Sequence, residues 1–206
     1  LRYGHRSRLI DHGKTDGIAN FITLIGVRYT TGRYEAERAV NLVFRKLGHR
    51  PPECRTATTP VFGGEIGNWA DFLAEVKRKG AGRFGEAMVE SLAHNYGAGY
   101  EAVLGLVDED PALAKPIGNS TTLRAEVVHA VRYEMAETLA DVVFRRTDVA
   151  TGSYPGRVAL RECAELFAAE RPSKAATVES QLDEIAARFP ARVVKRIDQN
   201  AGAAAG

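Results

Sequence analysis

The residues best suited to chemistry lie together between Gly26 and Arg33. An apolar run precedes this segment and a helical pattern follows it, so the segment reads as a junction between a strand and a helix. Such a junction presents unpaired backbone N–H groups at the positive end of the helix dipole. It also carries the hydroxyls of Thr30 and Thr31 and the guanidinium groups of Arg28 and Arg33. This combination predicts an anion-binding site, and the alternative is an ordinary junction with surface arginines.

Two glycine motifs match nucleotide-binding patterns by letter only. The segment from Gly97 to Ala102 fits G-x-G-x-x-A, but that fingerprint needs a strand before the glycines, and the preceding residues have a helical pattern. We therefore expect a glycine-capped turn between two helices there. Gly13-Lys14-Thr15 lacks the earlier glycine of a P-loop and is interpreted as a turn.

The histidines and cysteines do not have the spacing of a metal site. None of the five histidines lies three or four residues from another with a carboxylate partner, and Cys54 and Cys163 lie far apart. We predict no metal site and reduced thiols, with Cys163 in the core. His129 is expected at the boundary of an apolar helix face, and Asp141 and Arg145, four residues apart, are expected to pair on a helix.

The composition is that of a folded globular chain. It has 206 residues, of which 45% are hydrophobic and 26% charged, and its strongest apolar run, residues 21–27, is far shorter than a membrane span of about 20 residues. The first 50 residues hold ten Lys or Arg and four Asp or Glu, a net charge of +6, so the rest carry −4 of the overall +2. A basic opening segment suits an anionic ligand, a nucleic acid or an acidic membrane surface.

Residues 1–48 have the pattern of strand, turn, strand, tight turn and helix. The expected elements are a strand within 3–11, a turn over 12–17, a buried strand over 21–27 and a helix over 33–47 that Gly48 closes. The hydroxyls of Thr30 and Thr31 are the expected N-caps of the helix. Its apolar positions repeat at helical spacing (Ala36, Val40, Val43 and Leu47).

Beyond residue 48 the chain changes character. Residues 49–63 contain three prolines and little periodicity, which predicts a linker. Residues 64–200 are predicted to form an all-α domain, so the fold class is mainly α, with a small β-strand, β-strand and helix remnant before it. Helices are expected over 69–79, 84–96, 100–107, 123–146, 157–170 and 174–188, with a last turn near 193–197 and a disordered tail over 201–206.

The segment from Gly26 to Arg33 resembles a motif of the FAD-dependent glycerol-3-phosphate dehydrogenases. Their Gly-Gly-Lys-x-Thr-Thr-x-Arg, followed by Ala-Glu, aligns with Gly26 through Arg33 and then Ala36-Glu37. Residues 4–12 resemble the strand that precedes this motif, residues 59–64 a Leu-Pro-Gly-Gly boundary, and residues 125–147 the most recognisable helical signature of the family. The resemblance covers about residues 2–170, and it departs from the family where Val27 replaces glycine and Arg28 replaces lysine.

The resemblance implies an enzyme with a D-amino-acid-oxidase-like FAD domain and a helical C-terminal domain. Such an enzyme transfers a hydride from C2 of glycerol 3-phosphate to flavin, giving dihydroxyacetone phosphate, and passes electrons to a quinone or oxygen. Arg28 would then be catalytic and bind substrate together with Arg33. Gly26, Val27, Thr30 and Thr31 would contact the cofactor, where the helix dipole favours the negative charge of reduced flavin.

The family's N-terminal Rossmann βαβ unit is absent from this sequence, so we expect that this chain alone does not hold FAD and is inactive. The reduced thiols predict a cytoplasmic protein, and both a peripheral contact with the inner face of the membrane and a homodimer are left open. The alternative function is a non-catalytic helical domain that docks a partner subunit or a membrane surface. Nucleic-acid binding is not expected, because no helix has a dense Lys/Arg face and no aromatic platform is evident.

Overall fold

The computed structural model describes residues 7–26 and 28–203, which form two compact units, Leu1–Pro60 and Val61–Gly206. We call them unit 1 and unit 2. Sequence expectations for residues 1–6, for Val27 and for the last part of the tail, residues 204–206, fall outside the described residues. The chain is mainly α, as the sequence predicts.

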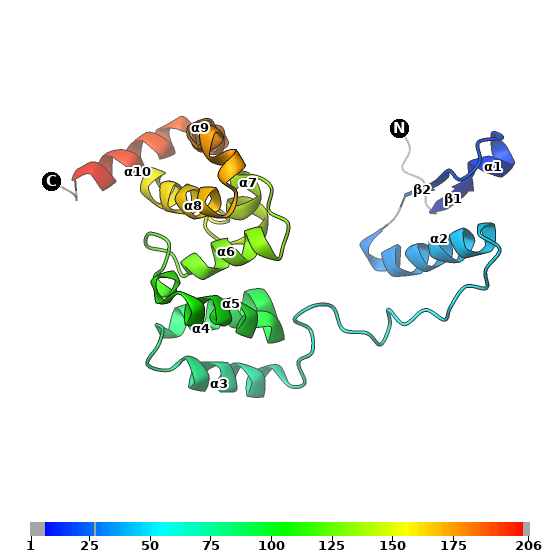
Figure 1. The fold of residues 1–206 in the computed structure, drawn as a ribbon, viewed down its shortest axis with the longest axis horizontal. Coiled ribbons are helices and arrows are strands. Elements are labelled where there is room, and N and C mark those ends of the chain that lie inside the picture. Colours follow the sequence, from blue (N-terminus) through cyan, green and yellow to red (C-terminus); the bar gives the residue numbers. More distant parts are fainter. Residues whose placement is uncertain (1–6, 27, 204–206) are drawn as a thin grey trace. The chain divides into compact units, whose positions relative to one another are not determined.

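Unit 1 is a β-hairpin followed by one long helix (Figure 1). Its elements are β1 (Arg8–Asp11), the helical turn α1 (His12–Thr15), β2 (Ile22–Ile25), a 3-10 turn (Tyr29–Thr31) and α2 (Gly32–Lys46). The strands are antiparallel, with Arg8 opposite Ile25 and Asp11 opposite Ile22. The predicted order of elements is confirmed, although both strands are shorter than expected.

Polar contacts hold the hairpin together and fasten the end of α2 to it. Asp11 accepts hydrogen bonds from the Gly13 amide and from Lys46 Nζ, the latter at 2.6 Å. The bond from Lys46 is the main reason that the pKa of Asp11 lies below its usual value. His12 contacts Thr23 Oγ1 through Nε2 at 2.8 Å. Gly48 has φ +74°, which confirms its predicted left-handed role after the helix.

Unit 1 buries almost no apolar surface, contrary to expectation. β2 is only partly buried, and the predicted apolar face of α2 is open, with Val40, Val43 and Leu47 exposed by 50%, 43% and 64%. Among its described residues only Glu35 is buried. One helix on a two-stranded hairpin offers too little surface to cover its own apolar side chains.

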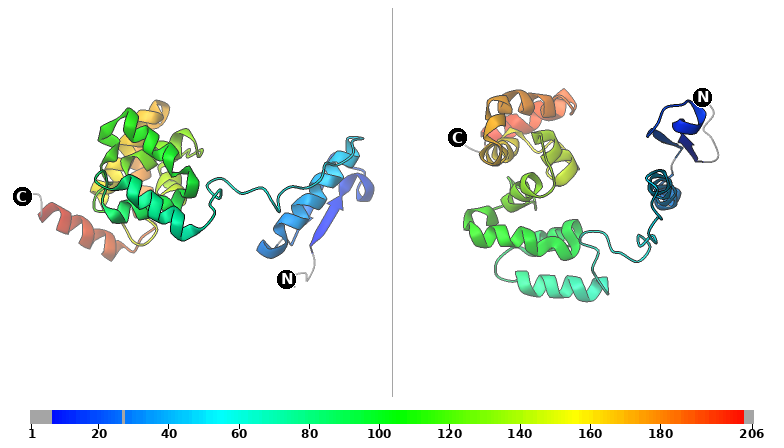
Figure 2. Two further views of the ribbon diagram at one scale, coloured as in Figure 1. Left: turned by 90° about the horizontal axis from the view of Figure 1, so that it is seen from below. Right: turned by 45° about the vertical axis from the view of Figure 1, so that its right-hand side comes forward.

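Unit 2 is a stack of helices that runs from α3 at one end to α9 and α10 at the other (Figure 1), and Figure 2 shows the same order from two further sides. The helices are α3 (Trp69–Gly80), α4 (Glu86–Tyr96), α5 (Tyr100–Glu109), α6 (Arg124–Arg132), α7 (Leu139–Asp141), a π-helix (Val142–Arg146), α8 (Arg157–Glu170), α9 (Val178–Ala186) and α10 (Ala191–Ala203). Short 3-10 turns lie over Gly97–Gly99, Pro111–Ala114 and Pro172–Thr177.

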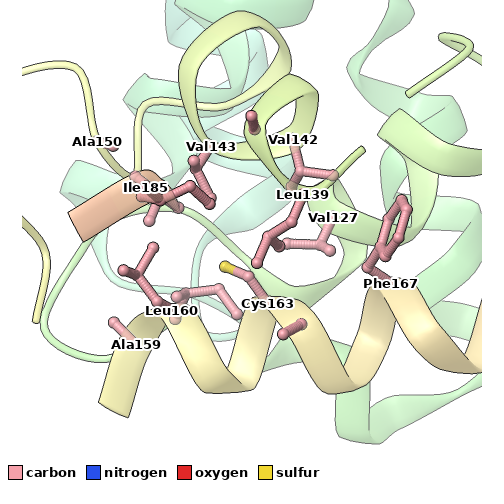
Figure 3. Close-up of a cluster of buried hydrophobic side chains, with 14 of the residues drawn as sticks. Val127, Leu139, Val142, Val143, Ala150, Ala159, Leu160, Cys163, Phe167 and Ile185 are labelled. Carbon is pink, nitrogen blue, oxygen red and sulfur yellow. The ribbon is translucent and has the colours of Figure 1, made fainter. Parts of the chain in front are cut away.

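Helix α6 lies between two hydrophobic cores. Ala125 and Val128 pack with α3, α4 and α5, whereas Val127, Ala130 and Val131 pack with α7, α8 and α9. Figure 3 shows the second core, in which Cys163 lies among aliphatic side chains, with Val127 and Phe167 near by. The prediction that Cys163 belongs to the core is confirmed.

The predicted continuous helix over 123–146 is wrong. The chain leaves α6 after Arg132 and passes through Met135, which has φ +58° and a side chain exposed by 80%. It then restarts at Thr138, whose hydroxyl accepts from the Asp141 amide, while the Asp141 carboxylate accepts from the Thr138 amide. This reciprocal capping box starts a new helix, which overrides the apolar spacing that runs through the gap.

The two glycine motifs form turns as predicted, whereas the last two helices differ in length from the prediction. Gly97–Gly99 forms the predicted turn between α4 and α5, and residues 12–15 form a helical turn in place of a P-loop. The helix expected over 174–188 is shorter, since a 3-10 turn comes before α9. α10 is much longer than a last turn and continues to Ala203, so the first three residues of the expected disordered tail are helical.

Candidate functional site

The predicted anion site is formed by the chain between β2 and α2. Gly26 follows β2 and has φ +76°, a left-handed conformation that glycine adopts without strain. Arg28 is extended, and the 3-10 turn over Tyr29–Thr31 then leads into α2 at Gly32. The sequence therefore placed the strand, the turn and the helix start correctly, while Val27 lies outside the described residues.

The first turn of α2 receives no side-chain cap. Thr31 occupies the N-cap position, but its hydroxyl donates to the Arg28 carbonyl oxygen at 3.4 Å instead of accepting from the helix. Thr30 is exposed. The expectation that these hydroxyls cap the helix is wrong, because the 3-10 turn directs Thr31 back toward Arg28. The N–H groups at the start of α2 are consequently free of side-chain caps and suited to an anion.

The two arginines of the predicted site occupy different surroundings. Arg28 is exposed and forms no ion pair with another described residue. Arg33 lines a pocket of about 310 Å³ between α2 and residues 52–56, together with Val40 and Cys54. Arg28, Thr30 and Thr31 do not line that pocket. The structure thus gathers the helix start and Arg28 at one place and directs Arg33 toward another.

The predicted pair of Asp141 and Arg145 is confirmed, with 2.7 Å between Arg145 Nη1 and Asp141 Oδ1. Burial acts to raise the pKa of Asp141, but hydrogen bonds from Thr138 and Glu137 bring it below its usual value. Arg145 also lines a shallow pocket with Arg188, whose own partner is Glu184 at 2.7 Å. Because both arginines are neutralised locally, the structure supports a structural role for them.

Within residues 7–26 and 28–203, no three His, Cys, Asp or Glu side chains come close enough to hold a metal ion. None of the described helices is long and apolar enough to cross a membrane.

Sequence reasoning missed a buried polar group around α6. His129, expected at a helix boundary, is exposed by only 2%, and Glu126 on the same helix is fully buried. Tyr96 and Glu134 lie beside them. The available signal was the position of Glu126 in the first turn of its helix, where a carboxylate reaches back to a backbone amide; Glu126 does so to Leu123 at 2.7 Å.

Comparisons with known proteins agree on one family. Residues 54–177 match the family described as the C-terminal domain of alpha-glycerophosphate oxidase. A glycerol-3-phosphate dehydrogenase of Synechocystis is 37% identical over 143 residues, which is 69% of this chain and 25% of that protein. The anaerobic glycerol-3-phosphate dehydrogenase subunit A1 of Haloferax volcanii is 30% identical over 179 residues, 86% of this chain and 28% of that protein.

An aerobic glycerol-3-phosphate dehydrogenase of Staphylococcus haemolyticus is 28% identical over 144 residues, 64% of this chain and 25% of that protein. The chain therefore spans about a quarter of the length of the curated relatives it matches.

Proposed function

The chain belongs to the family of the C-terminal domain of alpha-glycerophosphate oxidase, and on this premise we propose that it is the C-terminal part of an FAD-dependent glycerol-3-phosphate dehydrogenase. In the proposed reaction, C2 of glycerol 3-phosphate loses a hydride and its hydroxyl loses a proton, which gives dihydroxyacetone phosphate. FAD, when bound, supplies the hydride acceptor. The observation that carries the proposal is that relatives aligned with this chain share the name glycerol-3-phosphate dehydrogenase.

The surface of unit 1 supports its assignment to a larger flavin domain. Its exposed large apolar side chains are Ile18, Phe21, Ile25, Tyr29, Tyr34, Val40, Val43 and Leu47. So much open apolar surface on so small a unit is typical of a piece whose packing partners are missing. The remainder of a flavin domain would cover these side chains.

The junction between β2 and α2 fits the role that the resemblance gives it. The uncapped first turn of α2 offers hydrogen-bond donors for an anionic edge of the cofactor. In this proposal Gly26, Thr30 and Thr31 contact the cofactor, as does Val27, which lies outside the described residues. Arg28, which has no ion pair with a described residue, is free to bind the substrate phosphate or the oxyanion that develops on C2. Arg33 is a second substrate-binding residue in this proposal.

The chain by itself is not expected to retain FAD. The sheet described in unit 1 has only two antiparallel strands, whereas the pyrophosphate of FAD needs a βαβ unit with parallel strands. We expect the purified chain to be colourless and unable to oxidise glycerol 3-phosphate. Stoichiometric yellow flavin that co-purifies with these 206 residues would contradict this part of the proposal.

The proposed enzyme is cytoplasmic and delivers electrons to a quinone or to oxygen. It also makes a peripheral contact with the membrane through α10. Arg192, Lys195 and Arg196 on α10 are exposed and have no ion pair among the described residues. Each such side chain near an anionic lipid surface contributes about 1 kcal/mol. Co-sedimentation with anionic vesicles that is lost when the three are changed to alanine would support this contact, and equal binding to neutral vesicles would contradict it.

Three variants of the full-length enzyme test the catalytic assignment. Arg28→Ala should lower kcat/KM by roughly 30- to 1000-fold, because a charge-assisted contact in a partly dry site is worth about 2–4 kcal/mol. Arg28→Lys, which restores the residue of the family motif, should retain most of the activity. Arg145→Ala is the control, since Arg145 pairs with Asp141 on a helix surface.

Melting temperatures measured on the same three proteins separate lost chemistry from lost stability. Near-parental kcat/KM for Arg28→Ala would show that the active site does not include this junction. A large loss for Arg145→Ala at an unchanged melting temperature would point to unit 2 instead.

A further inference from the structure

Three buried polar side chains and one partly exposed glutamate meet where α4, α6 and the loop after α6 come together. They are Tyr96 at the end of α4, Glu126 and His129 on α6, and Glu134 in the loop, and we call them the α6 cluster. The relative exposure is 0% for Glu126, 2% for His129 and 5% for Tyr96. The rings of Tyr96 and His129 are edge to face with centroids 5.4 Å apart, and His129 Nδ1 lies 4.0 Å from Glu134 Oε2.

The hydrogen bonds of the α6 cluster are incomplete. Glu126 Oε1 accepts from the Leu123 amide at 2.7 Å. The second oxygen of Glu126, the Tyr96 hydroxyl, His129 Nδ1 and Glu134 Oε2 are all buried and make no hydrogen bond of good geometry within the described chain. The Tyr96 hydroxyl is nevertheless close enough to Glu126 for hydrogen bonding to lower the pKa of that carboxyl. Buried polar atoms without partners are rare in folded proteins, and each of them calls for a physical explanation.

Protonation of Glu126 changes the balance of donors and acceptors in the α6 cluster. With both carboxylates ionised, the second oxygen of Glu126 and Glu134 Oε2 can only accept, whereas the Tyr96 hydroxyl can donate and His129 Nδ1 donates in one of the two neutral tautomers. One proton on Glu126 turns its second oxygen into a donor. The neutral His129 tautomer with its proton on Nδ1 already directs a donor toward Glu134 Oε2, 4.0 Å away. A single proton on Glu126 therefore removes a fully buried negative charge and adds a donor to the α6 cluster.

Burial is the largest effect on the pKa of both carboxyl groups of the α6 cluster, and it favours their protonated forms. Burial raises the pKa of Glu126 to about 7, against the opposing effect of the Leu123 amide, Tyr96 and Asn95, and Asp148 raises it further. Burial also raises the pKa of Glu134, although Arg146 opposes this, and lowers the pKa of His129. No cation pairs directly with Glu126 among the described residues, so a proton is the cheapest way to neutralise it.

We propose that the α6 cluster is a proton-binding site that holds α4 against α6, so that this contact loosens as the pH rises through neutrality. The ligand is the proton itself, and the two helices belong to the core that α6 shares with α3, α4 and α5. A neighbouring hydrogen bond from Asn95 Nδ2 to Asp148 Oδ2, at 2.9 Å, fastens the end of α4 to the segment after the π-helix. In this proposal, ionisation of Glu126 weakens the contact that Tyr96, at the end of α4, makes with α6.

The first test compares Glu126→Gln with the unaltered chain. The glutamine oxygen still accepts from Leu123, and its amide provides a permanent donor in place of the second oxygen. The melting temperature of the unaltered chain should fall by about 5–10 °C more between pH 5.5 and pH 8.5 than that of Glu126→Gln. Glu165→Gln is the matched control, because Glu165 is an exposed residue of α8.

Equal falls in the unaltered chain and in Glu126→Gln would overturn the proposal. A melting temperature that depends equally little on pH in Glu165→Gln would also overturn the proposal. Loss of any carboxylate would then produce the effect.

The second test needs no substitution. A carbon NMR titration of the glutamate carboxyl groups in the unaltered chain should show at least one that titrates above about pH 6, with apparent pKa values that belong to the coupled cluster. Titration of every glutamate below about pH 5 would overturn the proposal. Amide exchange locates the effect: protection in the last turn of α4 should fall with pH in the unaltered chain and persist in Glu126→Gln. Unchanged protection there in both proteins would refute the link to helix contact.

Discussion

The backbones of Gly63 and Gly97 lie in direct contact, and neither residue has room for a Cβ atom. A Cβ on Gly97 would collide with the Gly63 carbonyl oxygen, and a Cβ on Gly63 would collide with the Tyr96 carbonyl oxygen. Both glycines have positive φ, +77° at Gly63 and +52° at Gly97. The Ala98 amide donates to the Gly63 oxygen at 2.9 Å, so this contact fastens the start of unit 2 to the turn between α4 and α5.

Gly97→Ala should therefore be strongly destabilising. A left-handed backbone costs a residue with a Cβ about 1–2 kcal/mol, and the backbone collision adds to this, so we expect a loss of about 2–4 kcal/mol in the free energy of unfolding. Gly105→Ala is the matched control, because Gly105 lies inside α5 with nothing near its Cβ position, and alanine there should stabilise by about 0.5–1 kcal/mol. Urea unfolding of both variants tests this, and equal stabilities would contradict it.

The two cysteines should react at very different rates. Cys163 is fully buried, and burial raises the pKa of its thiol to about 12, so almost no thiolate exists near neutral pH. Cys54 is partly exposed, and its sulfur lies 3.0 Å from Thr56 Oγ1. A thiol-specific reagent at pH 8 should modify one cysteine in the native chain and two in denaturant. Peptide mapping that finds Cys163 modified first in the native chain would contradict this.

Unit 2 should fold without unit 1, but unit 1 should not fold alone. Unit 2 contains both hydrophobic cores, whereas the only buried residue among those described in unit 1 is Glu35. A chain that starts at Pro60 should give a helical circular dichroism spectrum and a cooperative thermal transition. Residues 1–60 should give neither. A random-coil spectrum for the longer piece would mean that its helices depend on unit 1.

The sequence predicted those elements whose local signals agree with their packing. Gly48 and Gly97 ended helices as expected, and Asp141 and Arg145 formed the expected pair. The junction at Gly26 was also placed correctly, because a strand and a helix with different periodicities meet there.

The misses come from two physical causes. The helical apolar spacing continues in steps of four from Val131 through Met135 to Leu139, and this hid the break after which Thr138 caps a new helix. The position of His129 was predicted wrongly because Tyr96 of α4, far away in the sequence, covers its ring. Periodicity within one helix carries no information about such a contact. Likewise, Val40 is exposed because a two-stranded hairpin is too small to cover the apolar face of α2.

Unit 2 should be most stable near pH 5 and lose stability on both sides. The pKa of Glu126 is about 7 in the folded state and about 4.5 in the unfolded chain, so the folded state binds the extra proton. This contribution is fully present below about pH 4.5 and is lost as the pH rises through 7. At about 1.4 kcal/mol per pKa unit, the loss by pH 8 is on the order of 3 kcal/mol.

Asp141 contributes to the loss of stability of unit 2 at acid pH. Its pKa in the folded state is lowered, so its stabilising contribution is present above its unfolded pKa, near 3.8, and is lost as the pH falls through the folded value. Urea unfolding of the piece that starts at Pro60, from pH 3 to pH 9, measures both limbs. Asp141→Asn should make the acid limb shallower and leave the alkaline limb unchanged, because Asp141 belongs to the capping box at Thr138 and is not a member of the α6 cluster. An optimum at pH 8 or above would mean that Glu126 is ionised in the folded protein at little cost.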